Sequence, residues 1–441
     1  MTRTGSSAKN KESVQTEIDM ESKRSSTAAG HIADLPEQIW WAILERLPPK
    51  SVLRFRAVCK SWLNRISNNN FLEEYHGRQK PQHLIVPVDP DNTRHKMSHR
   101  VDAVDFQHPE DGFRSIISFT SFGVFEVFDP DEETAEHLMS AVQGSIGGLL
   151  LVSFEHRCYI CNPGTKESRR LPQLDDHEIL GLYMLGDEFR VLYLKEDEEG
   201  DAEFFVLSVH QSLSNKSIGY CPVSPAANLP EIDGPKKLGF SLQSSAIEPP
   251  AMVGANLYWA PLELWPREIT VFDYQSELFH WMKLPKTKER SKSNTNNTMK
   301  VLELDGELGL SLHRRGESSV ELWVLDSLKM WELKHSIQLP VADITGFGAH
   351  TWDPFLMSMD GGVIVRCVSQ GQGQGQGGDG QQGTQALLYC NRDGELAPGP
   401  LFVGDLAAPA IHLFKQSIRR YALFQGHQQD ATSPLSLFRD L

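Results

Sequence analysis

Two cysteines three positions apart are the first feature of this chain that could carry chemistry. Cys158-Tyr-Ile-Cys161, with His156 close by, has the thiol spacing of a zinc-binding or redox pair. No second Cys-x-x-Cys pair follows at the spacing of a zinc finger. The segment has the pattern of a β-strand, in which residues i and i+3 point to opposite faces. We therefore expect strand or core cysteines at this position and no metal site.

Other residue patterns that carry catalysis are missing from the sequence. It contains no G-x-S-x-G, no H-E-x-x-H and no Walker-type phosphate loop. Residues 144–148 (GSIGG) have the composition of a β-turn, since no helix with a Lys-Ser/Thr pair follows them. Trp259, Trp323 and Trp331 are more typical of a packed core than of a ligand cage. The sequence thus predicts no catalytic residues and no cofactor.

Length and charge narrow the range of partners. The chain has 441 residues, enough for a small module and a large domain, and a formal net charge of −15 at pH 7. An acidic chain is a poor match for nucleic acid or for an anionic membrane surface, both of which attract clustered Lys and Arg. We expect neither as a partner.

The cysteine content and the start of the chain indicate a compartment. Six cysteines are too few for a disulfide scaffold in a chain of this length, which favours a reducing environment. The N-terminal residues lack the apolar core of a signal peptide, and no run of about 18 apolar residues occurs. We expect a cytoplasmic protein, a nuclear protein, or one found in both places.

Residues 31–78 have the pattern of a small helical module. Residues 1–30, which are rich in Ser, Thr, Lys and Glu, are expected to form a disordered tail. Asp34 and Glu37 have the spacing of a capping box, which would start a first helix. Further helices are expected near 50–58 and near 60–67, followed by a break at Asn68-Asn69-Asn70 and a short coda.

The three expected helices carry more apolar side chains than so small a unit can bury. The first helix alone has Ile39, Ile43 and Leu47 at helical spacing, and Trp40 and Leu44 widen this stripe. Surplus apolar surface on a helical unit indicates a partner protein. The partner would then decide the function of the chain.

From residue 80 to about 437 the pattern changes to short apolar runs between Gly, Pro, Asp and Asn clusters, which predicts an all-β domain. Leu-Pro pairs recur every 55 to 58 residues, with their prolines at 172, 230, 285 and 340 and a near match at 398. A period close to this is typical of kelch-type propeller blades. We predict a six- or seven-bladed β-propeller; the alternative is an irregular β-sandwich in which the spacing is a coincidence.

The two ends of the β domain decide how the ring closes. Segments 80–116 and 399–435 could add one or two blades; if they share a blade, the ring closes, with a last strand that includes 418–424. Two mobile inserts are expected, a polar one at 286–298 and a Gln/Gly tract at 369–385. The Gln/Gly tract is most simply a tolerated hairpin insertion, and a role in partner binding is the alternative.

The helical module resembles the F-box, and its Val-Cys-Lys-Ser-Trp run is the most specific part of the match. The β domain is similar to the kelch-type or F-box-associated domain of land-plant F-box proteins. The matching residues are Leu35-Pro36, Ile39, Leu44, Leu47-Pro48, Leu53, Arg56, Val58-Cys59-Lys60 and Trp62 in the module, and residues 147–150, 161–165, 254–259 and 322–325 in the β domain. The fold class expected is a small all-α three-helix F-box followed by a large all-β domain.

This resemblance implies the substrate-recognition subunit of an SCF-type (Skp–cullin–F-box) ubiquitin ligase, without catalytic, cofactor or metal residues of its own. The F-box would bind a Skp-type adaptor and, through it, cullin and RING subunits, while the propeller would bind a protein substrate. The residues expected to bind the adaptor are Leu35, Pro36, Ile39, Trp40, Leu44, Leu47, Pro48, Leu53, Val58, Cys59 and Trp62.

Three alternatives stay open at this point. The first is an interaction scaffold that binds the adaptor but never joins a cullin. The second is a propeller enzyme or sugar-binding protein with an accessory helical module. The third is a helical cap that contacts only the β domain. Some of the apolar residues of the module must also pack its own core, and the sequence does not separate these from the docking residues.

Overall fold

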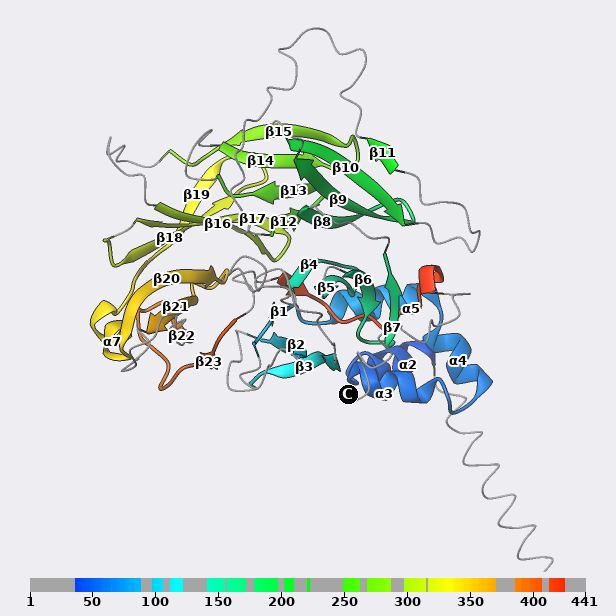
Figure 1. Cartoon of the computed structure of the whole chain (residues 1–441). Coiled ribbons are helices and arrows are strands. Elements are labelled where there is room, and N and C mark those ends of the chain that lie inside the picture. Colours follow the sequence, from blue (N-terminus) through cyan, green and yellow to red (C-terminus); the bar gives the residue numbers. More distant parts are fainter. Residues whose placement is uncertain are drawn as a thin grey trace, which may run out of the picture. The chain divides into compact units, whose positions relative to one another are not determined.

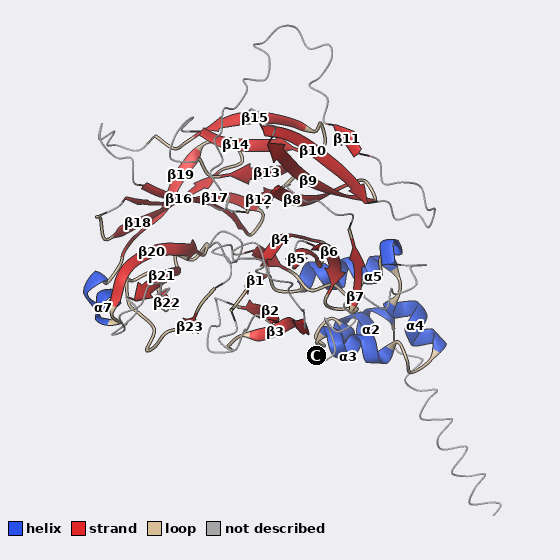
Figure 2. Ribbon diagram, in the orientation of Figure 1, coloured by secondary structure: helices blue, strands red, loops and turns tan. Residues whose placement is uncertain are grey.

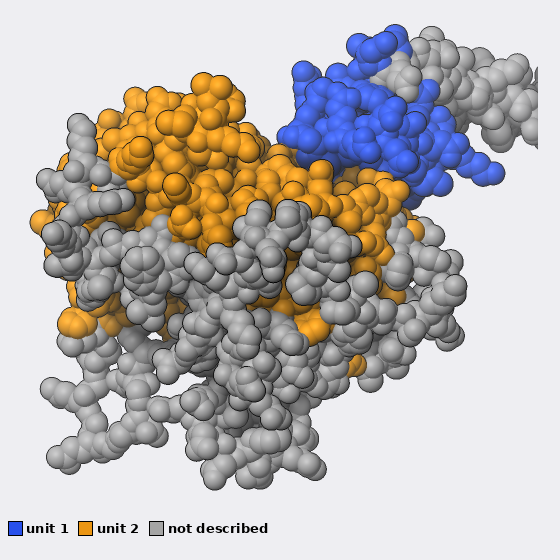
Figure 3. Space-filling view, turned by 90° about the horizontal axis from the view of Figure 1, so that it is seen from above, with its two compact units in different colours: residues 1–78 blue, residues 79–441 orange. Residues whose placement is uncertain are grey.

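The computed structural model describes residues 36–88, 97–105, 112–121, 141–154, 157–171, 178–196, 202–209, 220–222, 249–261, 268–286, 297–314, 316–369, 385–406 and 412–424. The chain divides into two compact units, residues 1–78 and residues 79–441, which Figure 3 colours separately. The expected tail at 1–30 lies outside the described residues. Among the described helices, none combines the length and the apolar character needed to cross a membrane.

The described residues of the first unit contain the three expected helices and a further one. They are α2 (Glu37–Leu44), α3 (Pro49–Phe55), α4 (Lys60–Ile66) and α5 (Asn69–Arg78) (Figure 1). The fourth helix covers the segment that the sequence predicted as a short coda. Asn68 starts this helix instead of only ending the previous one, because its side-chain Oδ1 accepts the backbone N–H of Asn70 at 2.9 Å.

The predicted capping box is wrong. Helix α2 begins directly after Pro36, which occupies the N-cap position and makes no side-chain capping bond. Glu37 is therefore the first residue of the helix and not its third, so it cannot serve as the distal residue of a capping box. Asp34 lies outside the described residues.

Aromatic residues form the core of this unit. The ring of Trp62 on α4 meets Trp40 on α2 edge-on, with centroids 4.2 Å apart, and stacks on Phe55 of α3 at 4.8 Å. Phe71 and Tyr75 of α5 are fully buried as well. Contacts of this kind stabilise a small core beyond the area that they bury.

The second unit is a six-bladed β-propeller of four-stranded antiparallel sheets, and strands make up most of its described residues (Figure 2). Blade 1 contains β24 (His412–Phe414), β1 (Gln82–Ile85), β2 (Met97–Val104) and β3 (Arg114–Ser121), and blade 2 contains β4 (Ala141–Ile146), β5 (Leu149–Phe154), β6 (Arg157–Asn162) and β7 (Glu167–Arg170). Blade 3 contains β8 (Glu178–Leu185), β9 (Glu188–Glu196), β10 (Ala202–Val209) and β11 (Tyr220–Pro222), and blade 4 contains β12 (Ala251–Val253), β13 (Asn256–Trp259), β14 (Glu268–Asp273) and β15 (Leu278–Lys283). Blade 5 contains β16 (Asn297–Leu304), β17 (Glu307–Arg314), β18 (Ser319–Leu325) and β19 (Trp331–Gln338), and blade 6 contains β20 (Ala349–Met357), β21 (Val363–Ser369), β22 (Gln385–Cys390) and β23 (Phe402–Gly404).

The ring closes as predicted, by pairing the two ends of the domain in one sheet. In blade 1 the C-terminal strand β24 pairs with β1, so that Leu84 lies opposite His412. The predicted position of the last strand is wrong, because 418–424 leaves the sheet and ends in the 3-10 turn η2 (Ala422–Phe424). A short helix, α7 (Val341–Gly346), connects blades 5 and 6.

Buried apolar clusters fill the contacts between neighbouring blades. One cluster joins blades 1 and 2 and contains Leu84 and Val152, and others join blades 2 and 3, blades 3 and 4, and blades 4 and 5. The largest joins blades 5 and 6 to blade 1, where it includes Ile85 and Val104. These contacts between sheets form the core of the propeller.

The repeat in the sequence is explained by the blade. Leu171, Leu284 and Leu339 each follow directly on the last strand of a sheet, and the strands led by Gly148, Gly254, Gly306 and Gly362 are each the second strand of a sheet. Pro398 does not occupy the equivalent place, since it precedes β23. Pro172 and Pro230 lie outside the described residues.

The two predicted inserts are shorter than expected. Asn297 and Thr298 already belong to β16, Ser369 is the last residue of β21, and Gln385 is the first residue of β22. Residues 287–296 and 370–384, which make up the rest of the two inserts, lie outside the described residues.

Candidate functional site

Helix α2 buries one apolar stripe and leaves the next one exposed. Trp40 and Leu44 are 5% and 1% exposed, whereas Ile39 and Ile43 are 46% and 44% exposed. Both pairs have the i, i+4 spacing that places two side chains on one face. The helix therefore presents an isoleucine pair that the folded unit does not use in its core.

Helix α4 and the residues before it show the same division. Ile66 is fully buried and Trp62 is half-buried in the aromatic core, while Leu63 is exposed. Val58 and Cys59, which come just before α4, are exposed as well. We call the exposed pair Ile39 and Ile43 of α2 the apolar face of the helical unit; Val58 and Leu63 are further exposed apolar side chains.

The residues expected to bind an adaptor fall into three groups. Pro36, Ile39, Pro48, Val58 and Cys59 are exposed; Leu47, Leu53 and Trp62 are half-buried; and Trp40 and Leu44 are buried. Leu35 lies outside the described residues. The expected set left out Ile43 and Leu63, although the width of the apolar stripe was a signal that one flank would stay exposed.

Polar contacts hold the frame of this unit. The Tyr75 hydroxyl donates to the backbone carbonyl of Leu47 at 2.8 Å, which connects α5 to the segment between α2 and α3. Arg78 pairs with Glu45 and, at 2.7 Å, with Glu74. A frame held in this way fixes the apolar face before any partner binds.

The charge around the apolar face is basic, in contrast to the rest of the chain. Residues 36–66 contain six Lys or Arg residues and only two Glu residues, in a protein whose net charge is −15. The exposed cations of this segment are Arg46, Lys50, Arg54 and Lys60. Such a surface favours a partner with acidic groups next to an apolar groove.

The cysteine pair of the propeller is part of its core. Cys158 lies in the cluster between blades 2 and 3 and Cys161 in the cluster between blades 1 and 2, which confirms that the two thiols point to opposite faces of their strand. Burial raises the pKa of the Cys161 thiol far above its usual range, so this thiol is not reactive. Within the described part of the chain, no three His, Cys, Asp or Glu side chains lie close enough together to hold a metal ion.

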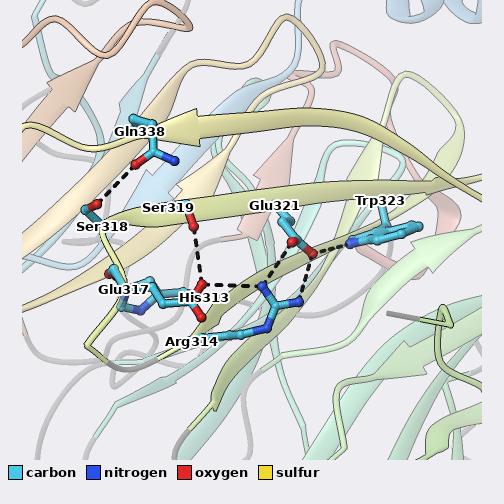
Figure 4. Close-up of polar contacts among 8 residues, drawn as sticks. All are labelled: His313, Arg314, Glu317, Ser318, Ser319, Glu321, Trp323 and Gln338. Carbon is cyan, nitrogen blue, oxygen red and sulfur yellow. Dashed lines mark hydrogen bonds and ion pairs between the residues drawn. The ribbon is translucent and has the colours of Figure 1, made fainter. Parts of the chain in front are cut away.

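The densest polar cluster of blade 5 has a structural arrangement (Figure 4). The Arg314 guanidinium lies 2.9 Å from one carboxylate oxygen of Glu321 and 3.3 Å from the other, and the Trp323 indole N–H donates to Glu321 at 2.9 Å. Each of these groups is directed at another group of the same sheet. The cluster therefore stabilises β17 against β18.

Comparison with known proteins identifies the helical unit. Residues 32–74 match the F-box domain. The match covers helix α2, which carries the apolar face, together with α3 and α4, and it ends within α5; the described strands of the second unit form a six-bladed propeller.

The curated relatives are F-box proteins of Arabidopsis thaliana. One is 23% identical over 328 residues, which cover 70% of this chain and 77% of the relative. A second, described as putative, is 26% identical over 275 residues. The matched region makes up 53% of this chain and 64% of the relative, so this chain spans just under two thirds of that relative. A third is 40% identical over 52 residues, only 12% of this chain and 14% of the relative.

The solved structures that resemble the chain are distant. A hypothetical selenium-binding protein from Sulfolobus tokodaii covers 78% of this chain and 96% of its own at 11% identity, with a TM-score of 0.34. A likeness at this level says nothing about function.

Proposed function

We propose that this chain is the substrate-recognition subunit of an SCF-type ubiquitin ligase. The observation that carries the proposal is the coincidence of the F-box match at 32–74 with the helices that leave Ile39 and Ile43 exposed. In this proposal the F-box binds a Skp-type adaptor, which brings the chain to cullin and RING subunits. The propeller binds the protein to be ubiquitinated.

The apolar face supports a helix-in-groove contact with the adaptor. The Ile39 and Ile43 side chains have the i, i+4 spacing with which one helix enters an apolar groove. Leu63 on α4 and Val58 just before it are further exposed apolar side chains that an adaptor could cover. The exposed cations between 46 and 60 favour an acidic rim on the adaptor.

The propeller supports the receptor half of the proposal through its rigidity. A closed ring with buried clusters between the blades presents its loops from a fixed scaffold, which is where binding residues are usually found. A receptor need not be an enzyme. Holding a substrate lysine near a charged conjugating enzyme raises its effective concentration and makes the encounter nearly intramolecular. The protein would act in the cytoplasm, the nucleus or both.

Co-purification from cells tests both steps. The full chain is expected to recover a Skp-type adaptor together with a cullin. The double variant Ile39→Asp/Ile43→Asp is expected to lose both, because it places two charges where the adaptor groove would bury methyl groups. A matched control is Val403→Asp, which adds a charge at an exposed apolar residue of β23 in the propeller and should leave recovery unchanged.

Two results would contradict the proposal at different points. Full recovery of the adaptor by the double aspartate variant would show that Ile39 and Ile43 are not part of the docking surface. Recovery of the adaptor without any cullin would leave an adaptor-binding scaffold and remove the ligase.

A further inference from the structure

We propose that residues Lys415–Phe424, here called the strap, latch the closed propeller and anchor the point at which the chain enters it. The strap follows β24, the strand that closes blade 1, and then runs over blade 2 outside the sheet. Although it contains no strand, Ser417, Ile418, Tyr421 and Leu423 are all buried. This burial is independent of the F-box and of any ligase activity.

The turn between β6 and β7 holds the middle of the strap. Asn162 is fully buried, and its side-chain N–H donates to the carbonyl of Arg419 at 2.9 Å. The same side chain accepts the N–H of Gly164 at 3.0 Å, so that one amide orders the turn and binds the strap. A Cβ atom on Gly164 would lie 2.2 Å from the carbonyl oxygen of Ser417. The turn therefore requires glycine because the strap passes so close to it.

The turn between β4 and β5 holds the strap at a second place. The Tyr421 hydroxyl donates to the carbonyl of Gly147 at 2.6 Å. A Cβ atom on Gly148 would lie 2.2 Å from Cβ of Ser417. The two glycine-containing turns of blade 2 thus form the surface on which the strap packs. The equivalent turn of blade 3 makes no such contact, because nothing lies within 4 Å of the Cβ position of Gly186.

The outer end of the strap is held by both apolar and polar contacts. The Tyr421 ring meets Phe189 of blade 3 edge-on at 5.3 Å, and Leu423 lies in the cluster between blades 2 and 3. Arg169 of β7 donates to the carbonyl of Leu423 at 3.2 Å. The strap therefore connects blade 1, where it starts, to the contact between blades 2 and 3.

The inner end of the strap meets the entry point of the propeller. Gln82, the first residue of β1, lies opposite Phe414, the last residue of β24. The Arg114 guanidinium donates to the side-chain oxygen of Gln82 at 2.7 Å and to that of Gln416 in the strap at 3.3 Å. A released strap would therefore loosen the residues through which the chain leaves the helical unit.

Hydrogen exchange on the full chain, read by mass spectrometry, tests the strap. Gly164→Ala and Gly148→Ala should each speed exchange in 415–424 by about tenfold or more, since an added methyl group displaces the strap. Exchange in 79–88 should rise with it. Tyr421→Phe removes the hydroxyl that bonds to Gly147 and to the Ser417 side chain, and it keeps the ring. It should give a smaller increase, and it keeps the test open if an alanine variant fails to fold.

Matched controls separate displacement of the strap from the cost of replacing a glycine. Gly148 has a φ of 81° and Gly186 a φ of 61°, so that both alanine variants strain the backbone but only Gly148→Ala meets the strap. Gly346→Ala matches Gly164→Ala, because neither residue has a positive φ and nothing lies within 4 Å of the Gly346 Cβ position.

Three results would overturn the proposal. Equal exchange in 415–424 for the test variants and their controls would show that the turns do not hold the strap. An equal rise in β14 and β18 would show that the substitutions weaken the whole ring. Faster exchange in 415–424 without a change in 79–88 would remove the anchoring of the entry point. Adaptor recovery is a separate readout that the strap variants should leave unchanged.

Discussion

The two units use large apolar side chains in different ways. The propeller places most of them in the contacts between blades, and its most exposed ones, such as Leu328 and Met330, lie in a tight turn ordered by Asp326. The helical unit exposes Ile39 and Ile43 as a repeated pair on one helix. Exposed apolar side chains in a turn are common on a protein surface, whereas two isoleucines one helical turn apart beside a buried stripe form a continuous apolar strip that favours a partner.

The difference predicts that stability and adaptor binding can be changed separately. Substitutions inside the propeller should lower the free energy of unfolding and leave the F-box competent. Substitutions of the apolar face should weaken binding and leave the unfolding free energy almost unchanged. The variants below test this separation.

The largest effect is expected at Phe272, in the contact between blades 3 and 4. Its ring is fully buried and meets Phe279 at 4.7 Å and Tyr183 at 5.7 Å. Phe272→Ala should lower the unfolding free energy of the propeller by about 3–5 kcal/mol, through lost apolar burial and the cavity left behind. Denaturant titration measures the loss. Reduced adaptor affinity in the same folded variant would show that the units are not separable.

A pH effect is expected at the strand that closes the ring. Burial lowers the pKa of His412 from 6.5 to about 4, and its neutral ring donates from Nε2 to the carbonyl of Val142 at 2.6 Å. Below pH 6.5 the unfolded chain binds a proton at this residue and the folded chain does not. The stabilising effect of a neutral His412 is therefore complete above pH 6.5 and is lost between pH 6.5 and about 4, with a slope of up to about 1.4 kcal/mol per pH unit.

Chemical denaturation at pH 7, 5.5 and 4.5 measures this slope. His412→Gln keeps a donor for the Val142 carbonyl but cannot titrate, so its stability should fall less steeply with acid than that of the natural chain. The exposed His350 provides the control variant His350→Gln, which should keep the original slope. Identical slopes in all three proteins would place the acid sensitivity elsewhere.

A smaller effect is expected for a single residue of the apolar face. Ile43→Ala should weaken binding of a Skp-type adaptor by about tenfold, since a truncated anchor loses its contacts in the groove. Its unfolding free energy should change by less than about 0.5 kcal/mol, because the side chain is exposed. Isothermal titration calorimetry measures the adaptor affinity, and denaturant titration of the same sample measures the unfolding free energy. A loss of stability with unchanged affinity would reverse the roles assigned to the two stripes.

The propeller could be predicted because several blades repeat the same constraint. The Leu-Pro pairs recur since the chain leaves the outer strands of blades 2, 4 and 5 in the same way, at Leu171, Leu284 and Leu339. Closure of the ring could be predicted as well, because unpaired strands at both ends of a sheet domain are unfavourable. The exact closing strand could not, since 418–424 has the apolar pattern of a strand but buries its side chains against turns of blade 2.

For the candidate site, the surplus of apolar residues could be predicted from the sequence, but which of them are exposed could not. Periodicity shows that α2 has too many apolar residues for one face, but it does not show which flank meets α4. The contact of Trp40 with Trp62 decides this, and it depends on tertiary packing that no local pattern encodes. The capping box failed for a local reason, because Pro36 took the N-cap position.

The smallest effect is expected at the polar cluster of blade 5, and it tests whether a substitution there leaves adaptor affinity unchanged. Trp323→Phe removes the indole N–H that Glu321 accepts and keeps an aromatic ring, so it should lower the unfolding free energy by about 1 kcal/mol. Trp331→Phe, which loses a donor to the carbonyl of Lys283 at 3.0 Å, is a matched variant with a similar expected cost. Denaturant titration of both gives the free energies, and adaptor affinity should be the same as in the natural chain. A change in adaptor affinity with either variant would show that blade 5 influences the F-box, against the separation of the two units.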